Sequence, residues 1–209
     1  DPDNPNVGEV WYNATANTLK YQFVSTAGVW STQPNMNTAR KSLRGAGTSN
    51  TAALAFGGTA NPPVYALTEL WNGTGWTEVG DLTLARAAMG AAGSSTAAIA
   101  FGGTGTGDSE TWNGSSWTEI TAMSTARSSM GPSMAGTTTA VLGAGGANGG
   151  IKNITERWNG SSWSELSDLN TTRYSMGGAG TITSALVFGG YTPGGQTAAT
   201  EKWNGASWT

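Results

Sequence analysis

The chain has 209 residues, ten of them basic and thirteen acidic, so its net charge is −3 at neutral pH. This balance provides no basic patch for a nucleic-acid backbone and argues against that partner class. Histidine and cysteine are both absent, which excludes thiol nucleophiles, imidazole bases, disulfides and zinc sites built from these residues.

The N-terminal part differs from the rest of the chain. Residues 1–6, "DPDNPN", are expected to be a linker or the cut edge of a longer chain. Residues 7–35 are predicted to form a partial blade or attachment segment. In it, Glu9-Val10-Trp11 and Gly28-Val29-Trp30 match two strands of the repeat described next, with an extra alternating run, "TLKYQFV", between them. No stretch of the chain is apolar over the length that crosses a bilayer.

From residue 36 the chain is a fourfold repeat. The units are 36–81, 82–122, 123–168 and 169–209. Each unit has an arginine near its start and two tryptophans near its end; the arginines are Arg40, Arg86, Arg127 and Arg173. A period of 40 to 50 residues with several short β segments is typical of propeller blades.

Each unit is predicted to contain four short strands. The first, such as "RAAMGAAG" (86–93), is rich in Gly and Ala, which suits an innermost strand beside a crowded axis. The second, such as "TAAIAFGG" (96–103), is apolar and ends in a double glycine, which predicts burial on both faces and a turn with positive φ. The third and fourth flank an Asn-Gly pair, for which we expect a hairpin with a type I′ turn.

The hairpin places the tryptophans on one sheet face. A two-residue loop would pair Trp71 with Thr74, whereas a four-residue loop would pair Trp71 with Trp76. Either loop puts Glu69, Trp71 and Trp76 on the same face, because side chains alternate along a strand. We expect these tryptophans to pack against the next blade, and the repeated Arg and Glu to form a blade-to-blade ion pair or to cap carbonyls. The repeat tryptophans are Trp71, Trp76, Trp112, Trp117, Trp158, Trp163, Trp203 and Trp208.

The order Arg, double Gly, Glu-x-Trp and second Trp resembles the kelch repeat of β-propellers over residues 36–209. The paired tryptophans around a tight turn depart from the usual kelch pattern of a Tyr ahead of a single Trp. The resemblance implies an all-β propeller of four-stranded antiparallel blades. Two arrangements stay open: five blades with the N-terminal one incomplete, or four full blades plus an N-terminal β-hairpin extension.

A second resemblance concerns origin. The segment "GEVWYNATANTLKY…GVW" is similar to a motif in tail-fibre and other virion proteins of tailed bacteriophages. It implies a virion protein, exposed on tail or capsid, that joins other virion proteins or neighbouring domains through residues 1–35. Unpaired sheet edges of a partial blade could also pair with a second subunit and give a homo-oligomer.

Catalysis is not predicted, because the glutamates recur at equivalent positions whereas a catalytic centre normally breaks a repeat's symmetry. No cofactor or metal site is predicted either. Ligand contacts are instead expected in the connections after each double glycine, which differ between units and would share one end of the ring. The candidate residues there are Tyr65, Asp108, Asn148, Lys152, Tyr191 and Gln196. The sequence thus predicts a non-enzymatic virion protein for assembly or adhesion to host glycans; the alternative is a secreted or cell-surface lectin-type propeller.

Overall fold

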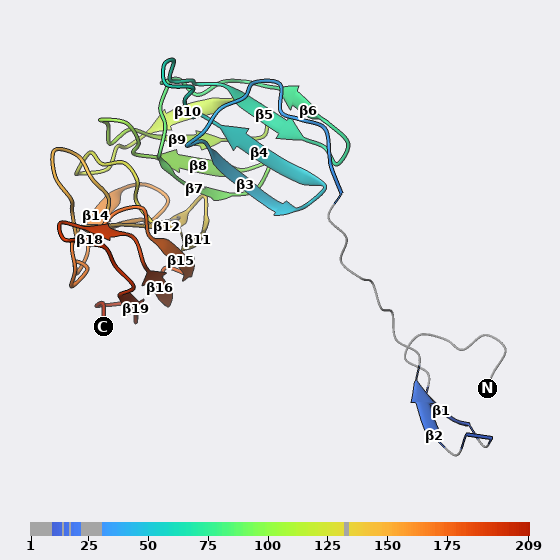
Figure 1. Ribbon diagram of the computed structural model, residues 1–209. Coiled ribbons are helices and arrows are strands. Elements are labelled where there is room, and N and C mark those ends of the chain that lie inside the picture. The colour runs from blue at the N-terminus through green and yellow to red at the C-terminus, as the bar shows by residue number, and fades with distance from the viewer. Residues whose placement is uncertain (1–9, 14, 17, 22–30, 132–133) are drawn as a thin grey trace. The chain divides into compact units, whose positions relative to one another are not determined.

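The computed structural model describes residues 10–13, 15–16, 18–21, 31–131 and 134–209. The chain divides into two compact units, Asp1–Gln33 and Pro34–Thr209. The described residues form strands and no helix (Figure 1). The all-β fold class predicted from the sequence is therefore confirmed.

The described part of the smaller unit is a β-hairpin. Strand β1 (Val10–Asn13) pairs antiparallel with β2 (Thr18–Tyr21), and Val10 lies opposite Tyr21. The strand predicted around residues 28–30 lies outside the described residues, so a fifth blade stays a prediction.

The larger unit contains one sheet for each repeat unit. The first sheet is β3 (Arg44–Ser49), β4 (Ala52–Phe56), β5 (Thr68–Trp71) and β6 (Trp76–Glu78). The second is β7 (Gly90–Gly93), β8 (Ala98–Phe101), β9 (Ser109–Trp112) and β10 (Trp117–Ile120). The third is β11 (Met134–Thr137), β12 (Ala140–Ala144), β13 (Thr155–Trp158) and β14 (Trp163–Glu165).

The fourth sheet has three strands, β15 (Gly177–Gly180), β16 (Ala185–Phe188) and β19 (Thr200–Trp203). An isolated bridge between Trp203 and Trp208 stands where the other sheets have a fourth strand. Between β16 and β19 lies an additional small hairpin, β17 (Tyr191–Thr192) and β18 (Gly195–Gln196). These antiparallel, blade-like sheets are compatible with a propeller-like fold.

The innermost strands are rich in glycine because a facing side chain leaves no room. Gly90 lies opposite Phe101, and a Cβ at Gly90 would come within 2.3 Å of the Phe101 ring. Gly177 likewise lies opposite Phe188, and a Cβ at Gly177 would come within 2.4 Å of the Phe188 ring. Neighbouring inner strands also contact one another in chain order, β3 with β7, β7 with β11 and β11 with β15.

Backbone hydrogen bonds join the units close to the inner strands. Ala88 donates its N–H to the carbonyl of Ser42 at 2.8 Å, Ser129 to Ala88 at 2.7 Å, and Ser175 to Ser129 at 2.7 Å. These four equivalent residues all have left-handed φ angles between 52° and 55°, a conformation uncommon for non-glycine residues. The bonds form a ladder from the first unit to the fourth.

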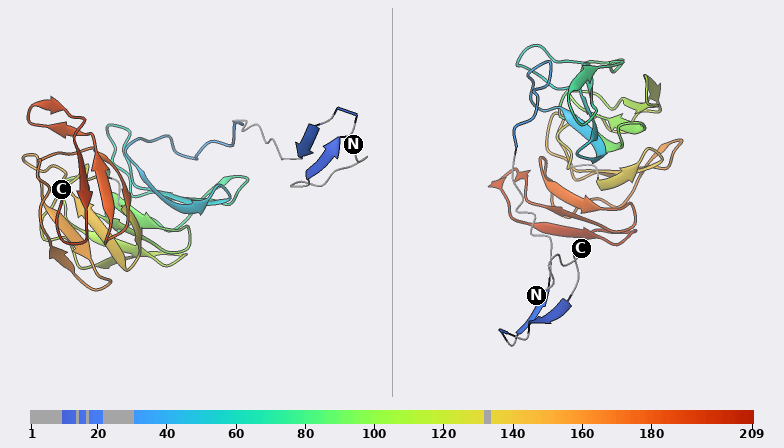
Figure 2. Two further views of the ribbon diagram at one scale, coloured as in Figure 1. Left: turned by 90° about the horizontal axis from the view of Figure 1, so that it is seen from below. Right: turned by 90° about the vertical axis from the view of Figure 1, so that its right-hand side faces the viewer.

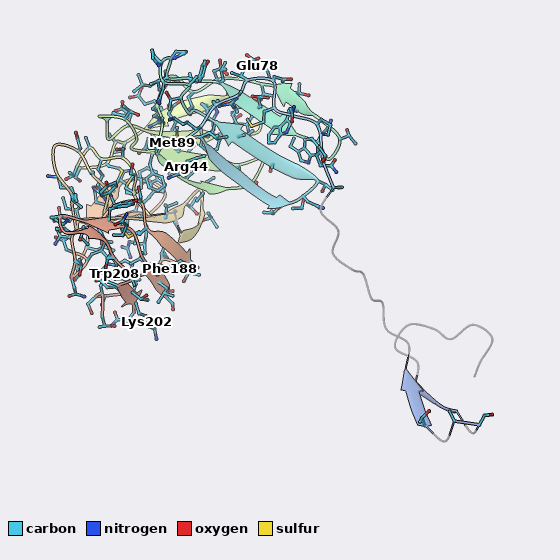
Figure 3. The ribbon with its side chains drawn as sticks, in the orientation of Figure 1. Arg44, Glu78, Met89, Phe188, Lys202 and Trp208 are labelled. Atoms are coloured by element: carbon cyan, nitrogen blue, oxygen red, sulfur yellow. The ribbon has the colours of Figure 1, made fainter. Side chains whose placement is uncertain are left out.

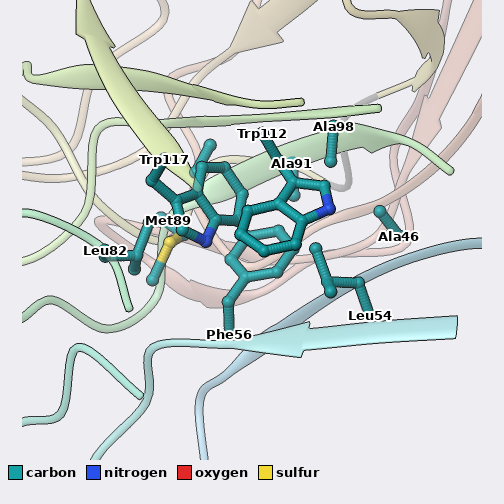
Figure 4. Close-up of a cluster of buried hydrophobic side chains, with 10 residues drawn as sticks. Ala46, Leu54, Phe56, Leu82, Met89, Ala91, Ala98, Trp112 and Trp117 are labelled. Atoms are coloured by element: carbon teal, nitrogen blue, oxygen red, sulfur yellow. The ribbon is translucent and has the colours of Figure 1, made fainter. Parts of the chain in front are cut away.

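The core consists of layers between consecutive sheets. Between the first and second sheets, Leu54 and Phe56 of β4 pack with Trp112 and Trp117 of the next unit (Figure 4). The layer between the second and third sheets contains two tryptophans and two methionines, and the layer between the third and fourth contains two tryptophans and one methionine. The sheets of residues 34–209 therefore pack face to face in series.

The second tryptophan of a unit fastens that unit to the sheet before it. The Trp117 indole N–H donates to the Thr68 hydroxyl at 3.0 Å, and its ring meets Phe56 edge-on at 4.7 Å. Trp163 and Trp208 make the same bond to Ser109 and Thr155, at 3.1 and 3.0 Å. The prediction that the tryptophan face lies between sheets is confirmed, but its direction is corrected: the face packs on the preceding sheet.

The predicted blade-to-blade ion pair is wrong. Each repeat arginine pairs with a glutamate of its own unit, as Arg86 does with Glu110 at 2.8 Å, and both side chains are buried. The other pairs are Arg40–Glu69, Arg127–Glu156 and Arg173–Glu201. The arginine instead reaches the preceding unit through its backbone, because the Arg86 carbonyl accepts the Gly58 N–H at 2.9 Å. The alternative prediction is confirmed, since Arg86 also donates to the carbonyls of Gly102 and Asp108.

The expected type I′ turn is also wrong. Trp71 lies opposite Trp76, which gives a four-residue loop, and only Gly73 within it has a positive φ, of 97°. Asn72 accepts the N–H groups of Thr74 and Gly75 on its side-chain oxygen, at 3.0 Å each. The asparagine therefore caps the loop with its side chain instead of adopting a left-handed backbone.

Candidate functional site

Connections of different kinds lie at opposite ends of the sheets because strands in each sheet alternate in direction. The inner hairpin turn and the Trp-Asn-Gly turn share one end, where the Trp71 indole donates to the Asn50 carbonyl at 2.9 Å. The connections after the double glycines lie at the other end, beside the segments that join one sheet to the next. There Lys41 and Thr59 exchange two backbone hydrogen bonds. We call residues 57–67, 102–108, 145–154 and 189–199 the variable rim.

An aromatic pair joins the variable rim of the fourth unit to the segment beside it. The rings of Tyr174 and Tyr191 are stacked, with centroids 5.5 Å apart and planes inclined by 28°. Tyr191 is 41% exposed, and the Gln196 amide donates to its hydroxyl at 3.4 Å. Tyr191 and Gln196 begin and end the small β17–β18 hairpin, which stands out from the sheets (Figure 2, left).

Tyr174 is absent from the residues proposed from the sequence. It follows the repeat arginine and so belongs to the regular part of the unit, whereas the residues proposed from the sequence all lie in the variable connections. Comparing the units supplies the missing signal, because the equivalent positions hold Lys41, Ala87 and Ser128. A single backbone bridge between Tyr174 and Tyr191 brings the two segments together.

The other proposed residues are spread over the remaining connections. Tyr65 is half-buried, and its backbone bonds to Gly58 and Arg86. Asn148 is exposed and donates to the Ala126 carbonyl at 3.2 Å. Lys152 is half-buried, and its backbone bonds to Gly146 and Arg173. The structure places these three residues on the rim but shows no contact between their side chains in the described part of the chain.

Asp108 has a structural part in the second unit. Its carbonyl accepts hydrogen bonds from the Arg86 guanidinium and the Gly102 N–H. Burial lowers the pKa of Arg86, and the charges of Glu110 and Asp108 act against this lowering. Asp108 thus serves the buried arginine, which leaves the Tyr174, Tyr191 and Gln196 cluster as the best-defined surface on the rim.

Arg44 is a second residue that the sequence reasoning missed. It lies opposite Phe56 at the start of β3, where the equivalent residues are Gly90, Gly131 and Gly177. Its guanidinium donates to the Met89 carbonyl at 2.6 Å and burial lowers its pKa. Because Met89 belongs to the second unit, Arg44 links the first two sheets and serves the fold.

The opposite end carries a cavity of about 290 Å³ between the inner hairpin turns of the first three units. Small and hydroxyl-bearing residues line it: Thr48, Gly93, Ser94, Ala97, Thr137 and Thr138. The Ser94 hydroxyl also accepts the Thr96 N–H of its own turn, at 3.3 Å. This end is regular from unit to unit, so it has less scope for selective recognition than the rim.

Among the described residues, no three or more acidic side chains come together where they could hold a metal ion, and no helix could cross a membrane. No protein-family model matches the chain, and no curated protein matches it.

Proposed function

We propose that this protein is a non-enzymatic virion component that attaches to surface glycans through its variable rim. The observation that carries the proposal is the stacked Tyr174–Tyr191 pair, which offers an exposed aromatic face beside the Gln196 amide. Sugars present flat apolar faces edged by hydroxyls, so an aromatic platform with an adjacent amide suits them. The assignment to a phage particle is supported by the N-terminal sequence motif.

The scaffold supports this use of the rim. Most of the repeated polar groups bond within the fold: each repeat arginine pairs with one glutamate of its unit, and seven of the repeat indole N–H groups bond to hydroxyls or turn carbonyls. The rim differs from unit to unit on this regular base. Binding residues commonly lie on such loops held by a rigid framework.

Glycan-array screening of the full chain tests the proposal, followed by calorimetry on the best ligand. Tyr191→Ala removes the exposed ring and is expected to weaken binding at least tenfold, about 1.4 kcal/mol. Replacing residues 190–199 by 103–108 of the second unit removes the whole hairpin and is expected to abolish binding. Thr183→Ala, in a turn at the opposite end, is the matched control and should bind normally.

The alternatives give different results. Absence of glycan binding, or binding that survives the loop replacement, would contradict recognition by the rim. Capture of a virion protein that depends on residues 1–35 and ignores the rim would favour assembly alone. A lectin-type protein of a cell surface would show the same dependence of glycan binding on the rim. It would, however, be missing from purified phage particles analysed by mass spectrometry.

A further inference from the structure

One face of the fourth sheet is open. Leu186 and Phe188 of β16 are 37% and 45% exposed, although their equivalents in the first sheet, Leu54 and Phe56, are 1% and 0% exposed. Phe188 and Lys202 both lie on this sheet (Figure 3). We call Leu186, Phe188, Thr200 and Lys202 the open face.

The open face repeats a surface that is covered elsewhere in the molecule. Thr200 pairs with Phe188 in the register, as Thr68 pairs with Phe56. The hydroxyl of Thr68 accepts the indole N–H of Trp117, and Ser109 and Thr155 receive Trp163 and Trp208 in the same way. Thr200 is exposed. The open face is therefore shaped for a tryptophan-bearing sheet.

The first sheet presents the matching face. Trp76 is equivalent to the buried Trp117, yet it is only half-buried. Its indole N–H has no acceptor among the described residues. Met36 and Leu43 are half-buried too, whereas their equivalents Leu82 and Met89 are 4% and 0% exposed.

The backbone has matching ends as well. The ladder that runs through Ala88 and Ser129 begins at the N–H of Ser42 and stops at the carbonyl of Ser175. Likewise Gly58, Gly103 and Gly146 donate to the arginine carbonyl of the following unit. The equivalent donor in the fourth unit is the N–H of Gly190, and the equivalent acceptor in the first is the carbonyl of Arg40.

We propose that the open face of one copy binds the first sheet of a second copy, head to tail. The indole of Trp76 then donates to Thr200 and covers Phe188, Ser42 donates to Ser175, and Gly190 donates to Arg40. Contacts of the same kind already join each unit to the next within the chain. One chain carries both of the surfaces that such a contact needs. Lys202 and Glu78 at the two surfaces have opposite charges, so they do not oppose the contact. Such a heterologous contact forms a filament or closes into a ring.

Sedimentation velocity on the full chain tests this, between about 1 and 100 µM, where a modest interface associates. The wild type is expected to associate with rising concentration. Phe188→Lys on the open face and Trp76→Ala on the first sheet should each lower the affinity of self-association at least about tenfold. Leu84→Lys is the control, because Leu84 is 42% exposed but lies in a connection between sheets.

Mixing the two variants gives the sharpest result. Phe188→Lys keeps an intact first sheet, and Trp76→Ala keeps an intact open face, so the mixture can form one junction and no more. We expect a dimer in the mixture and monomers in each variant alone. Thr200→Val, which keeps the shape and removes the hydroxyl, should weaken association without unfolding and serves if a charged variant fails to fold.

Hydrogen exchange provides a second, independent measurement of association. Amide protection at Gly190 and Ser42 should rise with concentration in the wild type and stay low in Trp76→Ala. A wild type that stays monomeric throughout the range would overturn the proposal. Association that persists in both variants, or a mixture without a dimer, would overturn it equally. None of these measurements involves a glycan, so their outcome is independent of the proposed function.

Discussion

The second tryptophans of the last three units, Trp117, Trp163 and Trp208, each satisfy two requirements at once, burial of a large ring and bonding of a polar N–H. Burying an indole removes about 150–250 Å² from water, which few other side chains of these glycine- and alanine-rich sheets can match. The indole N–H then needs a partner, and the hydroxyl of Thr68, Ser109 or Thr155 in the preceding sheet supplies it. One residue type thereby sets both the spacing and the register of neighbouring sheets.

Trp117→Ala is expected to lower the free energy of unfolding by about 3–5 kcal/mol. The substitution leaves a cavity against Phe56 and an unused hydroxyl at Thr68. Thermal melts followed by circular dichroism measure the loss. Tyr191→Ala is the control and should change stability by less than about 0.5 kcal/mol, since the ring is on the surface. Equal melting of both variants would mean that the tryptophan layer is not the main source of stability.

The buried ion pair gives a second prediction at this scale. Glu110→Gln leaves the Arg86 guanidinium buried without its counter-charge, which is expected to cost about 3–5 kcal/mol. The substitution also removes the charge of Glu110, which raises the pKa of Arg86 against the lowering by burial.

Urea denaturation measures this effect. Glu119→Gln in the same sheet is the matched control, because Glu119 is exposed and should contribute less than about 0.5 kcal/mol. A Glu110→Gln variant as stable as the control would show that Arg86 is held by its carbonyl partners alone.

At the scale of single elements, the Trp-Asn-Gly loop shows how local chemistry directs a turn. Asn113 accepts the N–H groups of Ser115 and Ser116 at 2.9 and 3.0 Å, and Gly114 has a φ of 99°. The same arrangement recurs around Asn72, Asn159 and Asn204.

Asn113→Asp is expected to retain stability because the carboxylate keeps the acceptor, whereas Asn113→Ala should cost about 1 kcal/mol. In a protein of this size that corresponds to a fall in melting temperature of about 2–4 °C. Differential scanning calorimetry resolves such a shift. If Asp and Ala behave alike, the asparagine side chain does not organise the loop.

A structural feature could be predicted from the sequence when its cause lies within a few neighbouring residues. The alternation that places Trp71 and Trp76 on one face is a property of any strand, so it was predicted correctly. The turn type was not predicted correctly, because the Asn-Gly rule applies to two-residue loops and the loop in the structure has four residues. The partner of Arg86 was not either, because the arginine sits on a segment between two sheets and the sequence does not show toward which sheet it turns.

The candidate site was predicted only in part for a similar reason. Tyr191 and Gln196 were proposed from the variation between units, and the structure joins them by a hydrogen bond. Tyr174 completes the aromatic pair from a distant stretch of chain, across a backbone bridge that no local pattern reveals. The β17–β18 hairpin that carries the site surrounds Pro193 and two glycines, a composition that reads as an ordinary loop.

For the whole molecule, the period of the repeat predicted serial, blade-like sheets, and the structure contains them. Whether the series closes into a ring was not predictable. Closure depends on the angle between successive sheets, which the bulk of the packed side chains determines, and a sequence period contains no such angle.

Serial packing leads to a last prediction, that separate layers contribute independently to stability. The layer around Trp117 and the layer around Trp208 share no residue. In a linear array, the free energy of unfolding is close to the sum of the stabilities of the single units and of the interfaces between neighbouring units. Trp117→Phe and Trp208→Phe each keep a ring but lose the bond to Thr68 or Thr155. Their effects on the free energy of unfolding should therefore add to within about 0.5 kcal/mol in the double variant, as measured by urea denaturation. A coupling above about 1 kcal/mol would contradict the serial arrangement and indicate that the two layers meet through a closed ring.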